Sequence, residues 1–184
     1  MVCREGLPSP CLVGIRDPVG AEIQRLSKKW DTNNTFIPHV TLVGGIECDL
    51  ATAKQVTEKL VSAHALRPVD IGFDTVGWGE IFHQTVFIKV EKTDELCQQH
   101  QCVLDAFHMN GSSDLYMPHM SLIYSHMSCS DRKQLADEEE RRVSDLLADV
   151  PLPLKGVCNL ELWYTPAADT SLKSWKRIET YQLA

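Results

Sequence analysis

The stretch Tyr116–Tyr124 reads YMPHMSLIY, and an altered copy of it, FIPHVTLV, occupies Phe36–Val43. The two copies share the order proline, histidine, apolar residue, hydroxyl residue, leucine. Both are rich in apolar and β-branched residues that alternate with a period of two, and this pattern predicts strands. On such a strand His39 and Thr41 point to one face while Val40 points to the other. We therefore expect each copy to bury an apolar face and to present an imidazole and a hydroxyl group elsewhere.

The repetition of this motif says more than either histidine alone. A single histidine on a strand is usually a structural residue. Here His119 and Ser121 repeat the arrangement of His39 and Thr41, with a proline before each histidine and a hydroxyl residue two positions after it. Packing alone gives no reason for this coincidence. The sequence therefore indicates one functional site that both copies build.

Charge and composition limit the class of ligand. The chain has 184 residues, 43% of them hydrophobic, which suits one domain or two lobes that share a core. Its net charge of −7, without a basic stripe, disfavours a long nucleic acid as partner, because such a ligand needs many Lys and Arg contacts. A small anionic ligand held by a few local groups is compatible with this charge.

The sequence also gives expectations for location and cofactors. No run approaches the roughly 18 apolar residues of a membrane helix, and the first residues do not combine a basic segment with an apolar one. The seven cysteines form an odd number without a CxxC pair, which indicates neither a zinc site nor a complete disulfide framework. We expect a soluble, cytoplasmic monomer with free thiols, no membrane partner, no metal and no cofactor.

Periodicity and turn residues predict the other elements. Strands are expected at residues 11–16, 157–164 and 173–182, a β-hairpin at 67–91 with its turn at 77–79, and helices that begin at Asp17, Thr52, Thr93 and Asp131. The run Glu138–Arg142 is interpreted as a solvated helix face. Gln84 shares the parity of apolar residues in the hairpin, so its amide is either satisfied by backbone groups or directed into a site.

These elements predict an α+β fold. The order strand, helix, histidine strand, helix, strand occurs twice, which indicates an internal duplication. The simplest arrangement is a single bilobal domain over residues 1–184, with two pseudo-symmetric lobes, one around His39 and one around His119. Each lobe would be an antiparallel sheet with helices on its outer face, and the polar faces of both histidine strands would line a central cleft.

With its paired His-x-Thr and His-x-Ser motifs, the sequence resembles the 2H phosphoesterase superfamily, and within it the small cyclic phosphodiesterases of the plant and yeast type. The resemblance extends to Phe82–Phe87 and Leu172–Trp175, so it covers most of the chain. It implies the bilobal fold of that superfamily and the metal-independent hydrolysis of cyclic phosphates on ribose. The implied partner is a small cyclic phosphate nucleotide, either a nucleoside 2′,3′-cyclic phosphate or ADP-ribose 1″,2″-cyclic phosphate.

The resemblance also implies the site residues. His39 and His119 correspond to the catalytic histidines, Thr41 and Ser121 to the phosphate contacts, and Tyr124 to a tyrosine near the substrate. Tyr124 has the opposite parity from His119, so a bulge or the end of the strand would be needed to turn it inward.

The chemistry of these residue types is consistent with that role. Opening a cyclic phosphodiester needs a base that takes a proton from water and an acid that protonates the departing ribose oxygen. Two imidazoles with an ordinary pKa of about 6.5 can do both near neutrality. The hydroxyls of Thr41 and Ser121 are suitable donors to the charged phosphate oxygens. The sequence does not distinguish the base from the acid.

Two other functions are compatible with the same motifs: processing of RNA ends, and nucleotide binding without catalysis by a module that recruits a partner. The acidic balance argues against the first and the two intact motifs against the second. A zinc hydrolase is disfavoured because no cluster of His, Cys and Asp has ligand spacing. The remaining histidines are expected at the surface or in structural roles: His64, His83, His100, His108 and His126.

Overall fold

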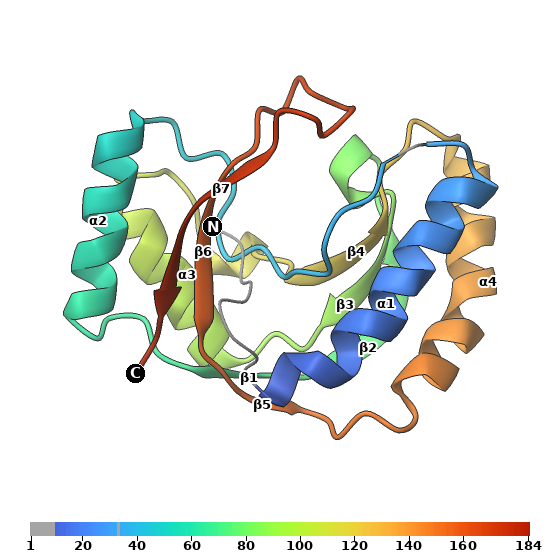
Figure 1. Ribbon diagram of the computed structural model, residues 1–184, viewed down its shortest axis with the longest axis horizontal. Coiled ribbons are helices and arrows are strands. Elements are labelled where there is room, and N and C mark those ends of the chain that lie inside the picture. Colours follow the sequence, from blue (N-terminus) through green and yellow to red (C-terminus); the bar gives the residue numbers. More distant parts are fainter. Residues whose placement is uncertain (1–9, 33) are drawn as a thin grey trace.

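The computed structural model describes residues 10–32 and 34–184. Its elements are α1 (Pro10–Lys29), α2 (Leu50–Ser62), β1 (Val69–Ile71), β2 (Phe73–Trp78), the 3-10 turn η1 (Phe82–Gln84), β3 (Val86–Val90), α3 (Asp94–Ala106), the 3-10 turn η2 (Ser113–Leu115), β4 (His119–Ile123), α4 (Cys129–Leu147), β5 (Leu154–Val157), β6 (Asn159–Tyr164) and β7 (Lys176–Gln182). The strands of this described part form antiparallel sheets in the orders β2-β3-β4, β1-β5 and β6-β7. Helices α1 and α4 lie at one end of the molecule and α2 and α3 at the other, with the sheets between them (Figure 1). The α+β class is confirmed.

Helix α1 occupies the place of the strand expected at residues 11–16. It runs from Pro10 to Lys29 and has Pro18 in its interior instead of its first turn. Periodicity alone cannot distinguish a short apolar strand from a helical segment, and Pro10 suits a first helical position because its missing N–H would have no partner there. The predicted strand and the predicted helix start at Asp17 were therefore wrong, and the proposed duplication lacks its first strand.

The first histidine segment is not a regular strand. Residues 34–49 form no strand: Val40 and Thr41 are isolated bridge residues, and the antiparallel partner of Val40 is Met120 of β4. Pro38 has no N–H to donate, which helps to explain why the ladder does not continue. This segment crosses the molecule from the α1 end to the α2 end (Figure 1). The strand prediction was correct for the second copy only, where β4 begins at His119.

The sequence predicted the β-hairpin correctly, but it placed the turn at the wrong residues. Strands β2 and β3 pair with Gly77 opposite Phe87 and Trp78 opposite Val86, so the connection is residues 79–85. Gly77 serves close packing, because a Cβ there would lie 2.9 Å from the Phe87 ring. The first part of the predicted hairpin, β1, pairs with β5 instead.

The helix starts are set by capping side chains. Thr93 caps α3, as predicted. Asp49 caps α2 and Ser128 caps α4, each accepting a hydrogen bond from a first-turn N–H, so these helices begin earlier than the predicted starts at Thr52 and Asp131.

The core contains apolar residues from nearly every element. Its fully buried side chains include Leu26, Val86, Ile88, Val103 and Leu122. Strand β4 is buried on both faces, from Met120 to Ile123, so the expected division into an apolar and an open polar face holds only at its first residue. None of the helices in the described part of the chain has the length and the apolar character that crossing a membrane requires.

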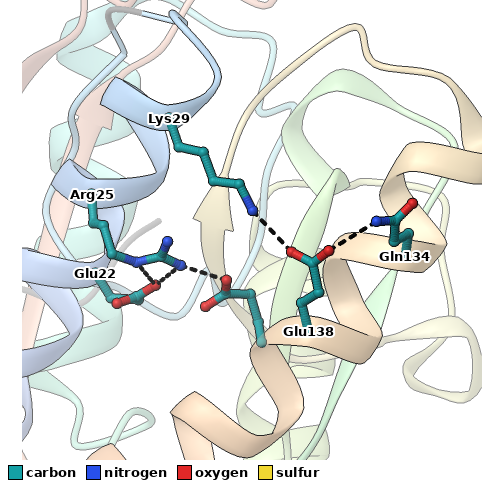
Figure 2. A network of polar contacts seen from close by, with 6 residues as sticks. Glu22, Arg25, Lys29, Gln134 and Glu138 are labelled. Carbon is teal, nitrogen blue, oxygen red and sulfur yellow. Dashed lines mark hydrogen bonds and ion pairs between the residues drawn. The ribbon is translucent and has the colours of Figure 1, made fainter.

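A charged network joins α1 to α4 (Figure 2). Arg25 contacts the carboxylate of Glu22 on its own helix, and its Nη2 lies 2.5 Å from a carboxylate oxygen of Glu139. Lys29 pairs with Glu138 at 2.9 Å nearby. Glu139 is only 1% exposed, so the interpretation of Glu138–Arg142 as a wholly solvated face was wrong. Burial and the neighbouring Glu22 carboxyl raise the pKa of Glu139 to about 6.

Candidate active site

A cleft of about 790 Å³ opens between five segments of the chain. They are the first histidine segment, the η1 region, helix α3, the stretch from residue 111 to Tyr124, and the end of β6 with the connection to β7. His39, Thr41, His119 and Tyr124 all line this cleft. The structure thus brings four of the five predicted site residues to one surface.

The bridge between Val40 and Met120 brings the two motifs together. In an antiparallel pairing, the neighbours of a bridged pair lie opposite each other in reverse order. The bridge therefore brings the first histidine segment beside the start of β4. His39, Thr41 and His119 line the cleft there, and Ser121 does not.

Both imidazoles are oriented by the same local hydrogen bond. Nδ1 of His39 lies 2.6 Å from the carbonyl oxygen of Ile37, and Nδ1 of His119 lies 2.9 Å from that of Met117. A carbonyl only accepts, so Nδ1 carries the proton in each ring. In the neutral state, Nε2 is then the basic nitrogen of both histidines.

The surroundings of His119 affect the pKa of its ring. Its ring is half-buried and packs against Phe87, with ring centroids 4.9 Å apart. Desolvation lowers the pKa of His119 below its ordinary value, and the bond to the Met117 carbonyl only partly opposes this. The neutral form that a general base needs is therefore favoured at His119.

Tyr124 follows the last residue of β4 and turns toward the first histidine segment. Its hydroxyl lies 3.5 Å from Nε2 of His39, and its ring stacks on Phe36 with centroids 4.1 Å apart. Burial raises its pKa well above the ordinary value for tyrosine, so the phenol stays neutral and remains a donor. Both features that could turn this residue inward are present before Tyr124: β4 ends at Ile123, and its pairing with β3 shifts register between Ser121 and Ile123, as at a β-bulge.

The two hydroxyl residues are placed differently. Thr41 lines the cleft. Ser121 is 4% exposed, and its hydroxyl donates to the carbonyl oxygen of His83 at 3.2 Å. The structure therefore puts Thr41 at the surface of the cleft and Ser121 behind it.

Comparison with known proteins identifies the family. The family described as "Cyclic phosphodiesterase-like protein" matches residues 16–183, which include both histidine motifs. The chain belongs to this family. The expected enzyme class, a phosphodiesterase and thus a hydrolase, is confirmed by that membership.

Two curated relatives agree with this membership in the cyclic phosphodiesterase-like family. A cyclic phosphodiesterase of Arabidopsis thaliana is 26% identical over 152 residues, which are 83% of this chain and 80% of the relative. The uncharacterized protein UNK4,15 of Schizosaccharomyces pombe is 30% identical over 98 residues, which are 51% of this chain and 46% of the relative.

His83 of this cyclic phosphodiesterase-like protein lines the cleft, although it was expected at the surface or in a structural role. Its ring stacks on Trp175 with centroids 5.6 Å apart, and burial lowers its pKa. Gln84 also lines the cleft, as one of its two predicted environments requires. The resemblance of Phe82–Phe87 to the family was the available signal for both residues.

His100 has a structural role at the edge of the cleft, as expected. Its Nδ1 lies 2.6 Å from the carbonyl oxygen of Leu42, and its ring stacks on Tyr116 with centroids 4.0 Å apart. The Tyr116 hydroxyl donates to the carbonyl oxygen of Thr41 at 3.0 Å. Together these rings hold the backbone that carries Thr41.

The tryptophans Trp163 and Trp175 also line the cleft and were not predicted as site residues. Trp163 lies near the end of β6, and Trp175 directly precedes β7. The resemblance of Leu172–Trp175 to the family was the available signal for Trp175. Among the described residues, no three His, Cys, Asp or Glu side chains converge in a way that could hold a metal ion.

Proposed function

We propose that this protein hydrolyses cyclic phosphates on ribose without a metal ion, with His39 and His119 as general acid and base. The observation that carries the proposal is the shared geometry of the two imidazoles. Each has Nδ1 committed to a backbone carbonyl, and both rings line one cleft. Each Nε2 is thus the nitrogen left for proton transfer. The name of the Arabidopsis relative supports cyclic phosphates as the substrate class.

The reaction follows from this arrangement. One neutral Nε2 takes a proton from water as the water oxygen bonds to phosphorus. The bond from phosphorus to one ribose oxygen breaks, and a protonated Nε2 of the other histidine gives that oxygen its proton. The product is a phosphate monoester beside a free ribose hydroxyl. We assign the base to His119, because burial lowers its pKa and favours the neutral ring.

Hydroxyl donors stabilise the charge on the other phosphate oxygens. Thr41 lines the cleft and is the direct donor that we propose. Tyr124 has a neutral phenol 3.5 Å from Nε2 of His39, so it can donate to the phosphate beside that ring. We also propose that Ser121 contributes to substrate binding. Its hydroxyl donates to the His83 carbonyl oxygen and so fixes His83, which lines the cleft.

The same proposal includes the wider architecture. The two motifs on either side of the Val40–Met120 bridge, with helices at both ends of the molecule, support a single bilobal domain of the 2H type with pseudo-symmetric lobes. We propose a cytoplasmic monomer that acts on small cyclic nucleotides and binds neither a long nucleic acid nor a membrane. Sedimentation and localisation of a tagged chain test these points.

The deciding experiment is a panel of cyclic phosphates assayed with and without EDTA. Turnover of a nucleoside 2′,3′-cyclic phosphate or of ADP-ribose 1″,2″-cyclic phosphate that resists the chelator is the expected result. Cleavage of RNA ends in preference to both would favour RNA-end processing. Binding of these nucleotides without turnover would favour the non-catalytic module, and full dependence on an added metal would overturn the proposed mechanism.

A further inference from the structure

Arg132 of α4 is a buried cation in contact with two segments that build the cleft. The residue is only 5% exposed. Among the described residues, every hydrogen-bond partner of its guanidinium is a backbone carbonyl oxygen. Nε donates to the carbonyl of Met127 at 2.9 Å, Nη1 to those of Gly79 at 2.5 Å and Ile81 at 3.2 Å, and Nη2 to that of Ser125 at 3.2 Å. Peptide dipoles thus take the place of a carboxylate partner.

The four carbonyls belong to two segments that are distant in sequence. Residues 79–85 connect β2 to β3 and contribute His83 to the cleft. Residues 124–128 connect β4 to α4 and begin with Tyr124, which also lines the cleft. A planar guanidinium presents five N–H donors in a rigid fork, so one side chain can hold both segments at once. Arg132 therefore fixes the place of each segment relative to the other.

Thr85 joins the same two segments from within. The residue is fully buried, and its hydroxyl accepts a hydrogen bond from the backbone N–H of Ser125 at 2.8 Å. The same hydroxyl lies 2.8 Å from the carbonyl oxygen of Phe82 and 3.0 Å from that of Ser125, and it can donate to either. The Ser125 carbonyl is thus shared between Thr85 and Arg132.

Helix stability does not explain a cation at this position. Arg132 is in the first turns of α4, which begins at Cys129, and a positive charge near a helix N-terminus opposes the helix dipole. Removing the charge from water also costs free energy, which the hydrogen bonds to the carbonyls must offset. Both costs are unfavourable for α4 itself. The contacts with the two segments are therefore the reason for this residue.

The aromatic rings on these segments pack on one another beside His39. The ring of Tyr124 meets that of His83 edge to face, with centroids 5.2 Å apart, and lies 5.9 Å from that of Phe82. Its hydroxyl lies 3.5 Å from Nε2 of His39. Because hydrogen bonds weaken steeply with poorer geometry, a small shift of the Tyr124 segment decides whether this hydroxyl can act at the site.

We propose that Arg132, together with Thr85, is a positioning residue that holds the Tyr124 hydroxyl in place beside His39. Neither residue lines the cleft, so neither touches the substrate. The proposal rests on the proposed cyclic phosphate hydrolysis and extends it to a pair of residues behind the site. They act on the reaction through Tyr124 alone.

The test is a double-variant comparison of kcat on a nucleoside 2′,3′-cyclic phosphate. Arg132→Lys keeps the charge, but its single nitrogen cannot reproduce the fork that spans both segments. It should lower kcat by about 2- to 12-fold, as loss of one hydrogen bond does, and leave KM within about twofold of wild type. In a protein that already carries Tyr124→Phe, the same change should have no further effect, because the hydroxyl through which it acts is absent.

Two further variants complete the test. Thr85→Val removes the hydroxyl, keeps the branched shape, and should show the same dependence on the Tyr124 hydroxyl. It decides the question if Arg132→Lys does not fold. Arg25→Lys is the matched control, because Arg25 also binds α4, through Glu139, but does not line the cleft. It should lower the melting temperature without changing kcat, and all assays are run well below each melting temperature.

The outcomes separate this proposal from the proposed function. A wild-type kcat in folded Arg132→Lys and Thr85→Val, a change in KM alone, or a loss that multiplies with that of Tyr124→Phe would overturn the positioning role. An equal loss of kcat in Arg25→Lys would also overturn it, because any loosening of α4 would then suffice. In each case the hydrolysis itself stands. Absence of wild-type turnover on every cyclic phosphate would overturn the proposed function.

Discussion

The hydroxyl of Tyr124 lies 3.5 Å from Nε2 of His39, although the two residues belong to different copies of the repeated motif. The tyrosine also stacks on Phe36, which precedes His39 in the first copy. Each motif therefore helps to build the surroundings of the other. This relationship and the orientation of the imidazoles lead to the following predictions.

His39 and His119 should act as a unit. His39→Ala and His119→Ala should each lower kcat by about 10²- to 10⁴-fold, because each removes one of two proton transfers in the same transition state. The double variant should lose little more than the worse single variant. Single-turnover kinetics measure this, with thermal melts as the control for folding. Losses that multiply, or single variants that unfold, would show independent or structural histidines.

The two hydroxyl residues should differ in what their removal changes. Thr41→Ala should lower kcat by roughly 10²-fold, as for one donor to a charged transition state, and leave the melting temperature unchanged. Ser121→Ala should also reduce stability, by about 0.5–1.5 kcal/mol, because it removes the hydrogen bond from the buried Ser121 hydroxyl to the His83 carbonyl. Assays and urea unfolding of both variants check this. Equal stability of the two would contradict the different placements of the hydroxyls.

The variant Tyr124→Phe tests the role of the Tyr124 hydroxyl separately from that of its ring. The variant keeps the stack on Phe36 but loses the hydroxyl near His39, so kcat should fall by about 2- to 12-fold, the range of one neutral hydrogen bond. Tyr124→Ala should in addition destabilise the fold by about 3–5 kcal/mol, as for loss of a buried aromatic side chain. A wild-type kcat for Tyr124→Phe would show that the Tyr124 hydroxyl has no role in catalysis.

The imidazole tautomers can be measured directly. Nitrogen NMR of the ligand-free protein should show Nδ1–H and an unprotonated Nε2 in the neutral forms of His39 and His119, because each Nδ1 faces a carbonyl oxygen. The His119 ring should titrate below its ordinary pKa of 6.5, since burial disfavours the cation. The His119→Ala spectrum provides the assignment. The opposite tautomer at either ring would contradict the proposed proton transfers.

The network in Figure 2 should make stability depend on pH. Glu139 has a pKa of about 6 in the folded protein against an ordinary 4.5, so the folded state binds more protons between these values. The stability due to that proton is complete below about pH 4.5 and is lost as the pH rises through about 6. Glu139→Gln should therefore gain about 1–2 kcal/mol of unfolding free energy relative to wild type between pH 4.5 and pH 7.5.

Urea unfolding at the two pH values measures this difference. Glu138→Gln is the matched control, because its carboxylate is exposed and paired with Lys29. Glu22 is present in all three proteins. Burial by itself raises the pKa of Glu22, but its hydrogen bonds with Arg25 and Glu139 and the charges of Arg25 and Arg142 together lower it, so its stability contribution is lost as the pH falls. Identical pH dependence of wild type and Glu139→Gln would show that Glu139 does not hold the proton.

Local sequence determined much of this protein. The repeated motif predicted β4 and identified His39 and His119 as a pair that one cleft now contains. Helical periodicity predicted α3 with a start at Thr93, and strand and turn patterns predicted the hairpin in which β2 pairs with β3. These predictions were correct because hydrophobic periodicity and helix capping depend on residues only a few positions apart, so the interacting groups lie within the same short segment.

Only the tertiary structure decided how the site is assembled. The isolated bridge from Val40 to Met120, the burial of Ser121 and the delivery of Trp163 to the cleft depend on elements that are distant in sequence. Glu139 likewise lies in a run of charges that reads as solvated, and it is buried because Arg25 of another helix faces it. Periodicity indicates which side of a segment is apolar. Which element packs against that side depends on contacts between residues that are distant in sequence, and no local pattern specifies these contacts.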